Sequence, residues 1–233
     1  MKSVIGCFLI GAVAFSSTGC STIKTNELTT DESQILKEKS VALSKYDKLP
    51  DFAAQTAANV QFGLLGLATA ISNGNKIINK NNIEDPALSI SRQLAEGLKS
   101  NHNVKIIESN EYVSAKSQIN DLVTKYAGHD FVLDVKTVGW NSIYFPSDWD
   151  SYRVMYSAHA RLIDIKSKQV VAEEVCTHVP EYADTNQAPS YNDLENGTGL
   201  KASLEKSVEY CVEHIRNMAK LHQANKEKLA VSQ

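Results

Sequence analysis

Apolar and polar residues alternate along several segments in the second half of the chain, which is typical of β-strands with one buried face. The alternation is cleanest over residues 152–166. Its apolar face holds Val154, Tyr156, Ala158, Ala160 and Leu162, and its polar face holds Arg153, Ser157, His159 and Arg161. Residues 130–140 alternate in a similar way, residues 169–179 follow after the short turn "KSK", and residues 40–46 and 104–109 are predicted as further strands. Together they indicate a sheet with one buried face and one more polar face.

Apolar residues at helical spacing predict helices around these strands. Residues 84–101 form the clearest one, because Asp85 is suited to cap its N-terminus and Pro86 to its first turn. A shorter helix is predicted over residues 114–128. Near the carboxyl end, residues 200–222 carry one apolar stripe, made of Leu204, Val208, Cys211, Val212 and Ile215. The pattern therefore predicts a single α+β domain, with a mixed, largely antiparallel sheet of about four to five strands covered by helices.

Residues 53–78 are rich in Ala, Leu and Gly and fit neither pattern cleanly. Their longest uninterrupted apolar run, residues 62–68, is far too short to span a membrane. The spacing of Gly66 and Ala70 would let a helix approach a neighbour closely. A buried core helix is the first interpretation, and a membrane-inserting or oligomerising hairpin is the alternative.

The amino-terminal segment resembles a bacterial lipoprotein signal. Lys2 is followed by an apolar stretch over residues 4–15 and then by "STGC", which resembles the lipobox, although Ser17 stands where leucine is usual. This resemblance implies cleavage before Cys20 and attachment of acyl chains such as palmitate to that cysteine, with Ser21 directing the protein to the outer membrane. The alternative is an ordinary exported protein.

The predicted organisation follows from this signal. We expect a signal peptide over residues 1–19, a lipidated tether over 20–39 with one helical turn after Asp31, a periplasmic domain over 40–222 and a polar tail over 223–233. The domain would face the periplasm, anchored to the outer membrane by the acyl chains on Cys20.

The charge balance argues against a nucleic-acid partner. The chain has 24 basic and 27 acidic residues, and removal of Lys2 with the signal leaves 23 against 27, a net charge of −4. Nucleic-acid binding usually needs a basic patch, and no run of like charge is long enough to bind phosphates or anionic lipid.

The cysteines of the mature chain are expected to form one disulfide. Cys7 lies in the signal and Cys20 would be acylated, which leaves Cys176 and Cys211 in an oxidising compartment. Zinc held by these cysteines with His178 and His214 is the alternative, although their separation is not a recognised zinc spacing. We therefore expect no metal and no cofactor.

Residues 139–152 concentrate aromatic side chains between two predicted strands. We regard five of them as candidates for partner binding: Trp140, Tyr144, Phe145, Trp149 and Tyr152. Exposed aromatic residues are common anchors of protein interfaces, and stacking on carbohydrate, with Asp148 and Asp150 accepting sugar hydroxyls, would use the same residues. Alternatively, the two strands extend through this segment and Trp140 and Trp149 cap the core.

Two motifs, "GHDFVLDVKT" and "ARLIDIKSKQVVAEE", carry a further resemblance. Residues 84–175 resemble the periplasmic α/β domain of curli-secretion-type lipoproteins, of outer-membrane activators of penicillin-binding proteins, and the amino-terminal domain of the Tol-system beta-propeller protein. In that hairpin Lys168 stands where these families prefer glycine.

The resemblance implies a protein that binds other proteins or oligomerises and has no known catalysis. We therefore expect a non-catalytic lipoprotein that binds or scaffolds another envelope component, either a protein or peptidoglycan, and a homo-oligomer is an option that the resemblance allows. Two alternatives stay open: a periplasmic enzyme acting on envelope glycan or peptide, and an oligomeric secretion or pore component.

Overall fold

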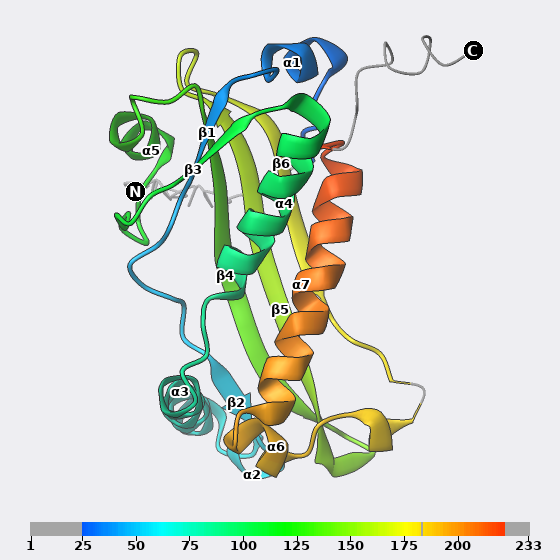
Figure 1. Cartoon of the computed structure of the whole chain (residues 1–233). Helices are drawn as coiled ribbons and strands as arrows, with labels where there is room; N and C mark the ends of the chain where they lie inside the picture. The colour runs from blue at the N-terminus through cyan, green and yellow to red at the C-terminus, as the bar shows by residue number, and fades with distance from the viewer. Residues whose placement is uncertain (1–24, 183, 222–233) are drawn as a thin grey trace, which may run out of the picture.

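The computed structural model describes residues 25–182 and 184–221, and its centre is a six-stranded mixed sheet (Figure 1). The hydrogen-bonded order is β3-β1-β4-β5-β6, with β2 also paired to β4. The strands are β1 (Ser40–Leu43), β2 (Ala53–Gln55), β3 (Lys105–Glu108), β4 (Phe131–Phe145), β5 (Asp148–Asp164) and β6 (Gln169–His178). Strands β4, β5 and β6 are antiparallel, whereas β1 and β2 run parallel to β4. This arrangement confirms the predicted α+β class.

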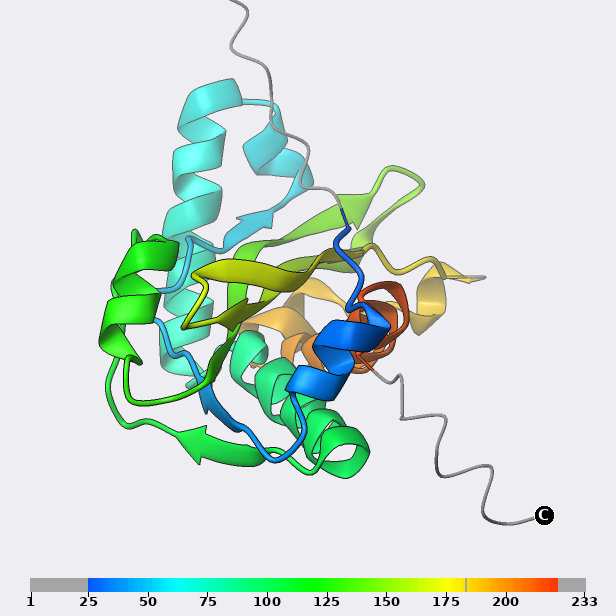
Figure 2. The ribbon, with the colours of Figure 1, turned by 90° about the horizontal axis from the view of Figure 1, so that it is seen from above.

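The helices are divided between the two faces of the sheet. Figures 1 and 2 show helices α4 and α7 side by side on one face. The short helix α5 packs on one end of the opposite face, where Leu122 and Val123 meet Val132 and Ile163 in a small apolar cluster. The helices are α1 (Thr30–Ile35), α2 (Ala57–Val60), α3 (Gly63–Lys80), α4 (Pro86–His102), α5 (Ile119–Lys125), α6 (Tyr191–Glu195) and α7 (Thr198–Met218), with a 3-10 turn η1 (Thr185–Gln187) before α6.

The main hydrophobic core lies between the sheet and helices α4 and α7. The N-terminus of α4 has the predicted cap, in which the carboxylate of Asp85 accepts a hydrogen bond from the backbone N–H of Ala87, with Pro86 in the first turn. The apolar stripe predicted for α7 is buried as expected. The stripe packs in the same buried cluster as Leu94 and Leu98 of α4 and Leu162 of β5.

The opposite face of the sheet holds a buried ion pair between neighbouring strands β4 and β5. The carboxylate of Asp134 accepts two hydrogen bonds from the guanidinium of Arg161, at 3.0 and 2.6 Å. It also accepts from the hydroxyls of Ser44 and Tyr46, both at 2.7 Å. Burial of the guanidinium acts to lower the pKa of Arg161, but the adjacent carboxylate outweighs it and holds that pKa above its usual value.

The described chain begins within the domain rather than in a tether. Leu28 and Leu36 are fully buried, α1 has a capping box between Thr29 and Glu32, and Asn26 pairs with Glu173 of β6. The expected tether over residues 20–39 is therefore wrong for its second half. Two buried leucines in a polar stretch are too few to show a period in the sequence.

Several predictions from the sequence lie outside the described residues. These are the signal peptide over residues 1–19, the acylated Cys20, the sorting residue Ser21 and the polar tail over residues 223–233. Across residues 25–182 and 184–221, none of the helices has the length and apolar character needed to cross a bilayer.

Candidate functional site

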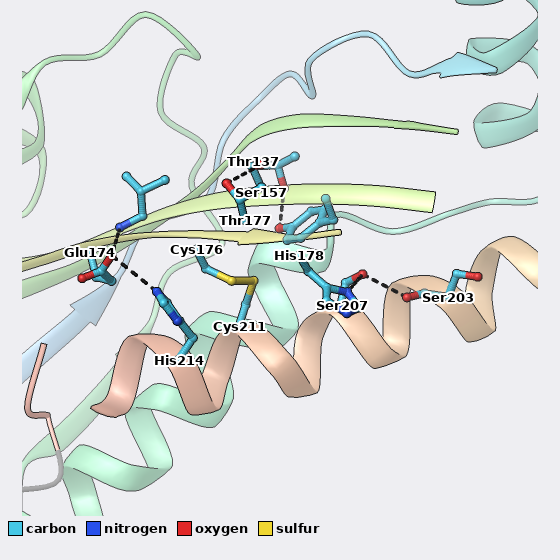
Figure 3. The surroundings of a disulfide bond; sticks show 12 residues. Thr137, Ser157, Glu174, Cys176, Thr177, His178, Ser203, Ser207, Cys211 and His214 are labelled. Atoms are coloured by element: carbon cyan, nitrogen blue, oxygen red, sulfur yellow. Dashed lines mark hydrogen bonds and ion pairs between the residues drawn. A yellow bond between two sulfur atoms is a disulfide. The ribbon is translucent and has the colours of Figure 1, made fainter. Parts of the chain in front are cut away.

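A disulfide fixes the carboxyl-terminal helix to the sheet. Cys176 of β6 and Cys211 of α7 form it, as predicted, and both residues are completely buried (Figure 3). Figure 3 places His214 and His178 on opposite sides of this bond. His214 lies 3.5 Å from the carboxylate of Glu174, and the Nδ1 atom of His178 lies 2.9 Å from the hydroxyl of Ser207.

The disulfide removes the cysteines as thiolate ligands. Among the residues that the structure describes, no cluster of three or more His, Cys, Asp or Glu side chains could hold a metal ion. The alternative zinc site of two Cys-His pairs is therefore not formed in this structure.

The aromatic segment over residues 139–152 is a hairpin, not a long loop. Strands β4 and β5 continue through it, and only residues 146 and 147 lie between them. Trp140 and Tyr152 are buried, so the prediction that these two residues bind a partner is wrong. The indole N–H of Trp140 donates to the carbonyl of Pro50 at 2.9 Å, and the ring packs edge-on against Phe52.

A β-bulge explains why Trp140 points into the core. The register of β4 against β5 shifts between Thr137 and Gly139. Before this shift Val135 and Thr137 face the core, and after it Trp140 and Ser142 do so. An extra residue in one strand reverses which alternate positions are buried, and the sequence alternation alone does not reveal this change.

The remaining aromatic residues cluster at the end of the hairpin. Trp149 is 61% exposed and packs edge-on against Tyr144, with 6.4 Å between ring centroids. Phe145 contacts the ring of Tyr182, and the guanidinium of Arg153 lies over the ring of Phe145, 4.8 Å from its centroid. We call residues 144–149 the aromatic hairpin end. It presents one large exposed ring, that of Trp149, which packs against the ring of Tyr144.

The acidic residues beside these rings stabilise the turn. The carboxylate of Asp148 accepts hydrogen bonds from the Ser151 hydroxyl at 2.7 Å and from the backbone N–H of Asp150 at 3.2 Å. The first of these bonds contributes most to a pKa of Asp148 below its usual value. A carboxyl with a lowered pKa is poorly suited to act as a general acid near neutral pH.

One partly buried carboxyl has the opposite shift. Burial raises the pKa of Asp85, while hydrogen bonds from the Thr137 hydroxyl and the Ala87 N–H oppose that change. The bond from Ala87 makes Asp85 the N-cap of α4, and the bond from Thr137 joins it to β4. We therefore assign it a structural role.

Helix α3 is buried on one side only, which corrects the expected core helix over residues 53–78. Its small residues Gly66, Ala70 and Gly74 form the buried face. A Cβ atom at Gly66 would lie 1.7 Å from the carbonyl oxygen of Asn59 in α2, and one at Gly74 would lie 2.0 Å from that of Phe52. The close-packing glycines therefore serve contacts within the chain, between α3 and the segment that precedes it.

The opposite side of this helix pair is exposed and apolar. Leu64 and Leu65 are 85% and 79% exposed. We call the exposed set the apolar tip, and it consists of Val60, Phe62, Leu64, Leu65 and Leu67. Figure 2 shows the free end of α3, with α2 alongside it, projecting beyond the sheet. The sequence carries one signal for this tip that the first interpretation missed: residues 52–75 contain no charged side chain.

The apolar tip and the aromatic hairpin end lie at the same end of the molecule. Figure 1 shows α2, α3 and the turn between β4 and β5 at one end of the long hairpin and α1 at the other. The pairing of β2 with residues 141–143 of β4 explains this placement, since α2 follows β2 almost directly. The apolar tip and the aromatic hairpin end thus lie together, far from α1.

Comparison with known proteins gives weak likenesses. No family model and no curated protein matches the chain. Among solved structures it is similar to the PelC dodecamer from Paraburkholderia phytofirmans, with 12% identity and a TM-score of 0.38 over 87% of this chain and 96% of that chain.

Two lipoproteins give comparable values. Lipoprotein GNA1162 from Neisseria meningitidis has 12% identity and a TM-score of 0.34, covering 77% of this chain and 99% of that chain. Uncharacterized lipoprotein B from Nitrosomonas europaea has 13% identity and a TM-score of 0.33, covering 84% and 87%. At scores and identities this low, the likenesses establish neither a common fold nor a shared function.

Proposed function

We propose that this chain is an outer-membrane lipoprotein whose periplasmic domain binds another envelope component and catalyses no reaction. The anchoring part rests on the lipobox-like "STGC" at residues 17–20. The binding part is carried by one observation, the exposed Trp149 on the aromatic hairpin end.

The aromatic hairpin end has the properties of a binding anchor. Tryptophan is among the residues that most often dominate the binding energy of an interface. Trp149 is the second residue of β5 and rests against Tyr144, so part of its conformational freedom is already lost before a partner arrives. A ring that is ordered in advance binds at a smaller entropic cost.

The two carboxyls with shifted pKa values described above support a role without catalysis. Asp148 is hydrogen-bonded within its own turn and has a lowered pKa, and Asp85 caps a helix. A periplasmic glycosidase would instead need an acid held protonated near neutral pH beside a second carboxylate. The hairpin end supplies surface for contact rather than a pair of that kind.

The anchor is tested by the substitution Cys20→Ala. Acyl chains contribute about 0.8 kcal/mol for each buried CH₂ group, so their loss should move the protein from the outer-membrane fraction to the soluble fraction or leave it uncleaved. Density-gradient fractionation of cell envelopes, with Cys7→Ala as the matched cysteine control, measures this change. Retention of the Cys20→Ala variant in the outer membrane would contradict acylation as the principal anchor.

The binding surface is tested by Trp149→Ala. We expect the yield of crosslinked partner recovered from intact cells to fall at least about tenfold, the loss typical of an interface anchor, while the free energy of unfolding changes by less than about 0.5 kcal/mol. Tyr112→Ala is the matched control, because Tyr112 is equally exposed but lies outside the hairpin end. Equal recovery with both variants, or a large loss of stability in Trp149→Ala, would contradict this assignment.

A further inference from the structure

The apolar tip, formed by residues 60–67, is held in place by the packing of α3 on the segment that precedes it. Gly66 and Gly74 hold α3 against the backbone of the preceding segment, so the exposed leucines stand on a firmly packed base. Exposed apolar patches on soluble domains usually mark contact sites, because leaving them in water costs free energy. The packing of the tip therefore leaves its apolar side free to meet something outside the described chain.

The absence of charge favours lipid as the occupant. Residues 52–75 contain no Asp, Glu, Lys, Arg or His, so the tip can enter the region between lipid headgroups and acyl chains without burying an ionised group. Protein interfaces usually have a polar and charged rim around their apolar centre. The exposed apolar run is also too short to span a bilayer, which suits a shallow position in the interface.

The proposed anchor sets the orientation in which the tip can meet lipid. Cys20 and Thr25, the first described residue, are separated by five peptide units, which reach at most about 17 Å. An acylated Cys20 would therefore hold the α1 end of the domain beside the membrane. Because the tip lies at the other end of the sheet, it meets the bilayer when the long axis of the domain lies along the membrane surface (Figure 1). This part of the argument rests on the proposed function.

We propose that the apolar tip inserts into the surface of the lipid bilayer and gives the domain a second, non-covalent membrane contact besides the acyl chains. The two contacts together would fix the orientation of the domain on the membrane. Leu64 and Leu65, the most exposed leucines, make the largest contribution.

The test uses a chain that starts at Ser21, which lacks the acylation site. The main hydrophobic core extends from Leu28 to Leu221, so this chain retains it. Flotation with vesicles of phosphatidylethanolamine and phosphatidylglycerol compares this chain with its Leu64→Ser/Leu65→Ser variant. Ile35→Ser/Val179→Ser is the matched control, since both of its residues are exposed apolar side chains outside the tip.

We expect the chain from Ser21 to float with vesicles, the tip variant to lose at least tenfold in partition coefficient, and the control to float unchanged. Trp149→Ala should also float unchanged, which separates this proposal from the partner-binding role. No flotation of the unsubstituted chain, or an equal loss in the control, would overturn the proposal. Self-association in sedimentation that disappears in the tip variant would assign the tip to a second copy of the chain and would also overturn it.

Discussion

Replacement of Arg161 by alanine is expected to destabilise the domain by about 3–5 kcal/mol, the usual effect of leaving a buried charge without its partner. Asp134 is only 1% exposed and would keep only the Ser44 and Tyr46 hydroxyls as donors among the contacts described above. Chemical denaturation, read as the free energy of unfolding, measures the loss.

Two further variants show whether the buried pair causes this effect. Arg92→Ala removes an exposed arginine that lies 3.7 Å from Glu108, and we expect it to cost less than about 1 kcal/mol. The double variant Asp134→Leu/Arg161→Met removes both charges and should recover much of the loss. A cost below about 1 kcal/mol for Arg161→Ala would mean that Asp134 is stabilised by water or other groups instead.

Removal of the disulfide is expected to destabilise the domain by roughly 3–4 kcal/mol on the chain-entropy model. Cys176 and Cys211 are separated by 35 positions, and the bond restricts the unfolded chain between β6 and α7. For a domain of this size the melting temperature of Cys176→Ala/Cys211→Ala should fall by roughly 10 °C. Alanine is preferable to serine because both sites are completely buried.

The redox state of the protein provides the control for this prediction. Mass spectrometry of the protein alkylated under denaturing, non-reducing conditions should find no modified thiol at either position, since both sulfurs are bonded. Modification at both cysteines, or an unchanged melting temperature in the double variant, would contradict a structural disulfide.

The sequence predicts the parts of the fold that depend on a regular period. The strand over residues 152–166 and the stripe on α7 were predicted correctly because their buried faces repeat every two residues or at helical spacing. The Asp85-Pro86 pair likewise marks the start of α4, since both residues act locally. The tight turn before β6 agrees as well, with Lys168 in the left-handed region at φ 59°, where the resembled families prefer glycine.

The sequence fails where tertiary contacts override the period. The bulge near Gly139 reverses which alternate positions of β4 are buried. Trp140, a binding candidate from the sequence, is therefore a core residue. The ring of Tyr152 packs against that of Tyr191, which lies far along the chain. The residues near Tyr152 in the sequence therefore do not predict that it is buried. The three-residue strand β2 is too short to show an alternation, and it alone explains why α2 and α3 lie beside the end of the hairpin.

The candidate surface was only partly predictable for a related reason. Trp149 was named from its aromatic neighbours, and the structure leaves it exposed. The apolar tip was missed because leucine and glycine in a helix most often indicate a core. Which side of α3 is buried depends on Asn59 and Phe52, whose carbonyl oxygens lie over the glycines.

The most direct test of the proposed function is photocrosslinking in intact cells from position 147, an exposed position of the aromatic hairpin end that leaves Trp149 in place, with the photoreactive residue at position 112 as the control. The proposal predicts a discrete crosslinked envelope component from position 147, absent from position 112, and its loss when the crosslinker at 147 is combined with Trp149→Ala. The same products from both positions, or none from position 147 in correctly anchored protein, would contradict the claim that the aromatic hairpin end binds an envelope partner.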